Sequence, residues 1–111
     1  MRGIFVTGFA ALFISGASAD EVKDALLSLE VCYMAQGVVN GAKTCQPPPM
    51  IVGAVFGDCS PEEDAFEFAI QHENQTNASI SRMALEKARE RYTPRIESQI
   101  LSGQTTMRKC P

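Results

Sequence analysis

Four cysteines, Cys32, Cys45, Cys59 and Cys110, have the widest chemical repertoire in this 111-residue sequence. Thiolates can bind zinc or exchange disulfides, but no Cys-x-x-Cys pair supports a zinc knuckle or a thioredoxin-type site. In a short exported chain, an even number of cysteines instead predicts two structural disulfides, with three possible connectivities. We therefore expect no metal site, and no motif indicates a cofactor.

His72 is the single histidine, and histidine is a common general base and metal ligand in proteins. No serine in a Gly-x-Ser-x-Gly turn is available as a nucleophile beside it, and no metal-ligand partner lies at helical spacing. In the last turn of a helix, its charge would interact favourably with the helix dipole. We interpret His72 as structural, with a site assembled around it in three dimensions as the alternative.

Two clusters of charged residues can also be explained without a functional site. The acidic cluster does not match a calcium loop and is typical of a helix start; it comprises Glu62, Glu63, Asp64 and Glu67. A basic stripe further along could bind an acidic partner, although interleaved glutamates are typical of a solvated helix face. The candidate partner-binding residues in this stripe are Arg82, Lys87, Arg91 and Arg95, with Arg89 nearby.

Apolar periodicity predicts the helices that position these side chains. The first runs from a cap at Asp20 to about residue 39, and its inward stripe includes Leu29, Cys32 and Tyr33. A proline-rich connector over 43–49 follows. Residues 50–56 are short and β-branched, so strand and helix compete; we favour a helix because no second strand candidate exists to pair with it.

A second group of helices is predicted after residue 59. Ser60 followed by Pro61 and Glu63 has the pattern of a capping box at the start of a helix that ends near residue 72. After a loop over 73–79, the last helix spans about 80–101, with a kink or break at Pro94. Its inward stripe comprises Leu85, Ala88, Tyr92, Ile96 and Ile100. Asn74 and Asn77 match the glycosylation pattern, whose use depends on the organism.

The N-terminus predicts export. A basic start, an apolar run over 4–14 and the small residues Ala17-Ser18-Ala19 form a signal peptide cut after Ala19. The expected organisation is a signal peptide (1–19), a helical domain (20–103) and a polar tail (104–111) tethered by Cys110. Removing Arg2 leaves nine basic and thirteen acidic residues, a net charge of −4, which argues against nucleic-acid binding. We expect the mature chain not to insert into a membrane.

Cys32, the run Val55-Phe56-Gly57-Asp58-Cys59, Glu63 and the segment 85–96 together resemble small uncharacterised exported proteins of proteobacteria. This resemblance covers about two thirds of the chain and implies a Cys32–Cys59 bridge with no known activity. Cys45 and Cys110 depart from the pattern. The remaining pair, Cys45–Cys110, would tie the proline connector to the tail.

The sequence thus predicts an all-α, disulfide-stapled bundle of three to four helices. The expected function is a non-enzymatic, periplasmic or secreted protein that acts by contact with another exported protein. The alternative is a small periplasmic enzyme or ligand carrier whose site assembles around His72. Fold alone does not choose between these classes.

Overall fold

A computed structural model describes the backbone of residues 12–111 and the side chains of residues 21–111. The elements in this part are α1 (Leu12–Gly41), a 3₁₀ turn η1 (Pro48–Met50), α2 (Val52–Asp58), α3 (Ser60–Asn74), α4 (Ala78–Ser102) and a π-helical segment η2 (Gly103–Arg108). No strand occurs within residues 12–111, and two disulfides are present. The predicted class, an all-α disulfide-stapled bundle, is confirmed.

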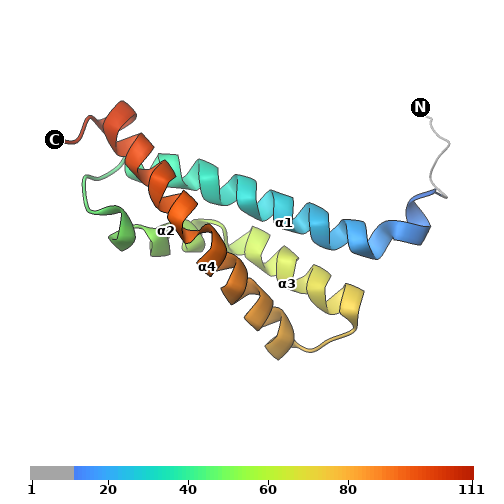
Figure 1. Ribbon diagram of the computed structural model, residues 1–111. Helices are drawn as coiled ribbons and strands as arrows, with labels where there is room; N and C mark the ends of the chain where they lie inside the picture. The colour runs from blue at the N-terminus through green and yellow to red at the C-terminus, as the bar shows by residue number, and fades with distance from the viewer. Residues whose placement is uncertain (1–11) are drawn as a thin grey trace.

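The helices form a bundle around the long α1 (Figure 1). α2 and α3 return along α1, and α4 then runs back so that its C-terminal end meets the C-terminal end of α1. α1 and α4 spread apart toward the other end of the bundle, where α3 packs against both. The bundle therefore narrows at one end and opens at the other.

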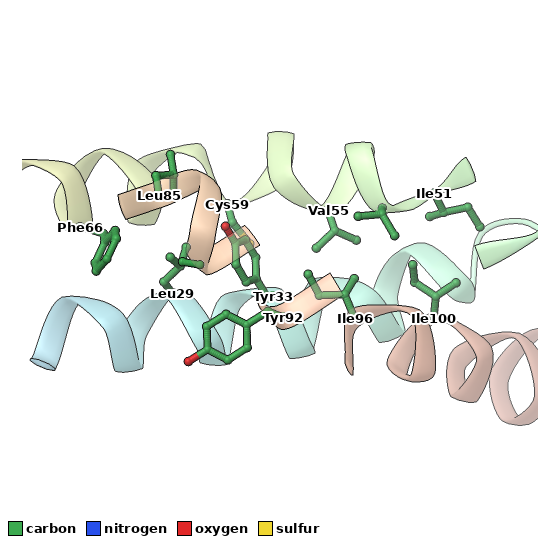
Figure 2. Packing of buried hydrophobic residues seen from close by; sticks show 12 residues of the cluster. Leu29, Tyr33, Ile51, Val55, Cys59, Phe66, Leu85, Tyr92, Ile96 and Ile100 are labelled. Carbon is green, nitrogen blue, oxygen red and sulfur yellow. The ribbon is translucent and has the colours of Figure 1, made fainter. Parts of the chain in front are cut away.

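Buried side chains from all four α-helices form one core (Figure 2). Leu29 and Tyr33 face inward from α1, as their spacing predicts. The predicted inward stripe of α4 is confirmed in full, since all of its members are buried: Leu85, Ala88, Tyr92, Ile96 and Ile100. Residues at steps of three and four share one helix face, so sequence spacing was sufficient to identify the buried faces of these two helices.

Glycines set the close approach of α1 and α4 at the narrow end. A Cβ atom on Gly41 would clash with the carbonyl oxygen of Ile100, and one on Gly103 would clash with that of Val38. A Cβ atom on Gly37 would lie 2.9 Å from the Cβ of Gln99. The two backbones therefore touch here because the side chains are missing.

Two disulfides staple the bundle. Cys32–Cys59 joins the middle of α1 to the junction of α2 and α3, and Cys45–Cys110 joins the connector to the C-terminal end. Both pairings agree with the prediction. Their sequence separations of 27 and 65 residues correspond to about 3–4.5 kcal/mol each in the chain-entropy model.

The predicted cap at Ser60 is wrong. α3 begins at Ser60 itself, with Cys59 as the N-cap and no capping hydrogen bond from a side chain. Only Cys59 separates α2 from α3, and its carbonyl oxygen already accepts a hydrogen bond from the Glu63 amide (2.9 Å). Because the preceding turn supplies this acceptor, the Ser60 hydroxyl is not used, and Glu63 is free to turn into the core.

Several predicted helix ends also differ. The helix favoured over residues 50–56 is present as α2, but it begins at Val52, after the 3₁₀ turn that ends at Met50, and extends through Gly57 to Asp58. The loop predicted over 73–79 is limited to 75–77, with Gln75 in the left-handed conformation (φ 52°) and Asn77 capping α4. α4 remains one helix across Pro94, so the predicted break does not occur.

The two ends of the domain differ most from expectation. Residues 1–11 of the predicted signal peptide lie outside the described part, whereas α1 extends back to Leu12, so Asp20 lies inside the helix rather than at its cap. At the other end, the predicted polar tail continues the helix. Gly103 has helical dihedral angles, and the π-helical segment reaches Arg108 because buried Gln104 donates to the carbonyl oxygens of Thr44 and Gln46.

Candidate binding surfaces

Glu63, which the sequence placed in a capping box, is a buried hub between three helices. It is 3% exposed and accepts hydrogen bonds from the Tyr33 hydroxyl (2.6 Å) and from two nitrogen atoms of Arg89 (2.8 and 2.7 Å). The Arg89 guanidinium also lies over the ring of Phe56, 4.6 Å from its centroid. Every polar atom of Glu63 is satisfied, so this network links α1, α3 and α4 rather than offering a free reactive group.

The network changes how its members ionise. Burial, followed by the hydrogen bond to Glu63, raises the pKa of Tyr33 far above its ordinary value. The same carboxylate raises the pKa of Arg89 through its hydrogen bonds. Tyr33 therefore remains a protonated donor and Arg89 a charged partner, which keeps the network intact across the physiological pH range.

The structure divides the predicted basic stripe into paired and unpaired cations. Arg82 forms an ion pair with Glu67 (3.4 Å), and Arg95 forms one with Glu30 (2.6 Å). Lys87 and Arg91 contact no carboxylate within 4.0 Å among residues 21–111. The four candidates therefore do not form a single patch of free cations: Arg82 and Arg95 are paired, whereas Lys87 and Arg91 are exposed and form no ion pair among residues 21–111.

These two cations border a groove between α1 and α4. We call it the cationic groove; its volume is about 520 Å³ and it is lined by Leu26, Phe66, Ala84, Lys87, Ala88, Glu90, Arg91 and Tyr92. The apolar members belong to three different helices. The sequence indicated the cations but not the groove, because the groove depends on how α1 and α4 diverge.

A second feature, absent from the predicted sites, is an exposed apolar face on α1. We call it the α1 face; it consists of the exposed Leu27, Val31 and Ala35 together with the partly buried Met34 and Val38. Leu27 is 54% exposed and Val31 is 62% exposed. At 100° per residue these positions lie opposite the core stripe of Leu29 and Tyr33. A helix that is apolar on both faces is typical of one covered on both sides, a signal that was present in the sequence.

Two shallow grooves flank the α1 face. One lies toward α3, has a volume of about 480 Å³ and includes Cys32 and Glu62; the other lies toward α4, has a volume of about 520 Å³ and includes Glu30 and Gln99. Asp24 and Glu62 line the continuation of the first groove, and neither forms an ion pair among residues 21–111. The side of the α1 face toward α3 therefore has an acidic rim.

His72 lies apart from these surfaces. Its side chain is 64% exposed, contacts Glu21 through Nδ1 (3.0 Å) and stacks on Phe68 with 5.9 Å between ring centroids. It lines neither groove beside α1 nor the cationic groove. It lies in the last turn of α3, the position that the sequence predicts.

One group of potential metal ligands comes together, but its chemistry does not suit a metal. The sulfur atoms of Cys32 and Cys59 and a carboxylate oxygen of Glu62 lie within 4.8 Å of one another. Both sulfur atoms belong to the disulfide, whereas metals bind the thiolate form. The disulfide leaves a single carboxylate donor, which is insufficient for a site.

Comparisons with protein-family models, curated proteins and solved structures find no significant match to this chain. Among the described helices, none has an uninterrupted apolar stretch long enough to cross a bilayer. The two disulfides indicate a protein that works outside the cytoplasm. The resemblance to small exported proteins of proteobacteria stays a prediction.

Proposed function

We propose that this protein is a non-enzymatic, exported helical domain that binds another exported protein through the α1 face. The observation that carries the proposal is the pair of large apolar side chains, Leu27 and Val31, that are more than half exposed on a helix whose opposite face is in the core. Contiguous exposed apolar surface on a small domain marks an interaction site.

The shape of the surface favours a helix as the partner element. The α1 face forms a ridge between two grooves, and helices pack by inserting the ridge of one into the groove of another. Asp24 and Glu62 lie along one groove without ion-pair partners among the described residues. We therefore propose an amphipathic partner helix with Lys or Arg beside its apolar stripe.

The compartment is part of the proposal. The two disulfides are consistent with export, and the predicted signal peptide specifies cleavage after Ala19. A periplasmic or secreted partner follows. Intact mass measurement of the protein recovered from periplasm or medium checks this point, since the expected N-terminal residue is Asp20.

The alternative, an enzyme or ligand carrier built around His72, lacks a supporting observation. That proposal requires His72 to share a pocket with other polar side chains, whereas its contacts are Glu21 and the ring of Phe68 on the open surface. Glu63, the most deeply buried carboxylate in residues 21–111, is occupied by Tyr33 and Arg89. The carboxylate of Glu63 is therefore not free to act on a substrate.

Site-specific photocrosslinking in the producing cell tests the proposed contact. A crosslinking amino acid placed at Val31 should give one discrete adduct, and the same group at Met50, which is 71% exposed and far along the chain, serves as the matched control. Adding Leu27→Lys to the variant that carries the crosslinker at position 31 should abolish the adduct without changing the thermal melting temperature. Added salt should lower the yield of the Val31 adduct, because the side of the α1 face toward α3 has an acidic rim.

Three outcomes contradict the proposal. Equal adducts from Val31 and Met50 would mean non-specific contact, and no adduct from Val31 would mean that the α1 face has no partner. An adduct with the mass of two copies of this chain would show that the face forms a homodimer. Sedimentation of the purified protein with and without Leu27→Lys distinguishes that last case.

A further inference from the structure

The cationic groove is a consequence of how α1 and α4 meet. Their backbones touch at Gly41 and Gly103, then separate toward the start of α4 (Figure 1). α3 fills one side of the resulting wedge with Phe66, whose ring lies beside Leu29 and Leu85 (Figure 2). On the other side the wedge remains open as a groove of about 520 Å³, within the range of small-molecule sites.

Small residues keep this groove open. Ala84 and Ala88 lie one turn apart on α4 and line it with methyl groups, and Phe66, which is 5% exposed, lies at its base. Leu26 of α1 forms the opposite wall, and Tyr92 closes one end. The Tyr92 hydroxyl donates to Glu30 (3.4 Å), so the ring borders the groove while its polar atom is occupied outside it. The lining away from the rim is therefore apolar.

The charged groups of the groove all belong to α4. Lys87 and Arg91 are four residues apart, and like charges at this spacing destabilise a helix. Glu90 also lines the groove, which leaves its rim with a net charge of +1, and α1 and α3 contribute no charged residue to it. An apolar trough with a cationic rim complements a ligand that has one apolar chain and one anionic head group.

We propose that the cationic groove binds a single-chain anionic amphiphile, specifically a free long-chain carboxylate. The alkyl chain lies over Phe66, Ala84 and Ala88, and the carboxylate accepts hydrogen bonds from Lys87 and Arg91. This proposal uses a different surface from the α1 face, because the Glu30–Arg95 ion pair and Tyr92 stand between them. The two proposals can therefore fail separately.

Titration with monomeric dodecanoate, followed by the methyl NMR signals of Ala84 and Ala88, tests the site directly. We expect saturable shifts at these methyl groups and much weaker binding of the cationic analogue dodecyltrimethylammonium. The double variant Lys87→Gln with Arg91→Gln should weaken dodecanoate binding about tenfold, because each exposed charge contact contributes modestly. Lys43→Gln removes an exposed cation outside the groove and should leave the affinity unchanged.

A second variant tests the apolar part. Ala84→Leu should fill the trough and abolish binding, and its thermal melt verifies that the fold is retained. Equal binding of both amphiphiles, or no effect of the double variant, would overturn the proposed head-group contact. Shifts seen with anionic vesicles or an acidic amphipathic peptide, but not with dodecanoate, would overturn the ligand class.

Discussion

Replacing Glu63 by glutamine removes the charge at the centre of the core while keeping the shape of the side chain. The carboxylate accepts three hydrogen bonds, from Tyr33 and twice from Arg89, and only 3% of the residue is exposed. Glutamine has one acceptor oxygen, and its amide group would point donors at the guanidinium. Arg89 would then retain a positive charge with no partner in the interior.

The size of the effect follows from the exposure of Arg89. Breaking a fully buried ion pair from one side costs about 3–5 kcal/mol. The Arg89 side chain is 32% exposed, so water recovers part of this penalty, and we expect a loss of about 2–3 kcal/mol in the free energy of unfolding. That is a large fraction of the roughly 5–15 kcal/mol available to such a domain.

Urea unfolding followed by circular dichroism, with both disulfides intact, measures this loss as a lower midpoint. Glu62→Gln is the matched control, since Glu62 is only partly buried and should stay within about 0.5 kcal/mol of wild type. The triple variant Tyr33→Phe, Glu63→Met, Arg89→Met removes all three polar partners together. We expect it to be more stable than Glu63→Gln, because no charge is left unpaired.

Two results would refute this reasoning. If Glu63→Gln changed stability no more than Glu62→Gln, the hydrogen bonds from Tyr33 and Arg89 to Glu63 would not form in solution. If the triple variant were less stable than Glu63→Gln, the network would contribute net stability of its own, rather than being costly mainly when broken.

Three further predictions concern the helix ends, the glycine contact and pH. Ser60→Ala should be nearly neutral, whereas Asn77→Ala should cost about 1 kcal/mol, because only Asn77 accepts a capping hydrogen bond; thermal melts compare them. Gly103→Ala should destabilise by about 1–3 kcal/mol through its clash with α1, while Gly57→Ala, with open space around it, should stabilise by about 0.4–1 kcal/mol. Because folding raises the pKa of Tyr33, its contribution to stability is complete below about pH 10 and is lost as the pH rises above that value. The free energy of unfolding should fall by up to about 1.4 kcal/mol per pH unit, which urea unfolding at a series of pH values measures.

Each of these has a clear contrary outcome. An equal loss for Ser60→Ala and Asn77→Ala would restore the capping box at Ser60. A neutral or stabilising Gly103→Ala would mean that α1 and α4 do not touch at Gly103. For the alkaline effect, Tyr33→Phe should flatten the slope, and an unchanged slope would assign it to other groups, such as Tyr92, whose pKa is also raised by burial and Glu30.

The sequence by itself determined the helical class, the inward stripe of α4 and the core stripe of α1. These depend on spacing along one helix, and a period of 3.6 residues fixes which side chains share a face whatever surrounds them. The two disulfide pairings also agreed with expectation, the first through a family resemblance and the second as the remaining pair. The exposed α1 face also corresponds to a second apolar stripe in the sequence of α1.

The tertiary structure alone decided the role of Glu63. Locally, Ser60-Pro61-Glu62-Glu63 has every mark of a helix start, so a capping role for Glu63 was the reasonable prediction. The residues that change this role, Tyr33 and Arg89, are 30 and 26 positions away in the chain. A glutamate side chain suits a helix cap and a buried ion pair equally well, so the local sequence does not choose between these roles. The choice depends on which distant residues the packing brings next to Glu63.

The same distinction applies to Gly103 and to the cationic groove. A glycine after a helical stripe usually ends the helix, but here the backbone of α1 lies against it, and the absence of a side chain permits contact instead of termination. That contact sets the divergence of α1 from α4, which in turn leaves Lys87 and Arg91 beside an open apolar trough. The sequence supplied the two cations, and only the angle between two helices determined what they border.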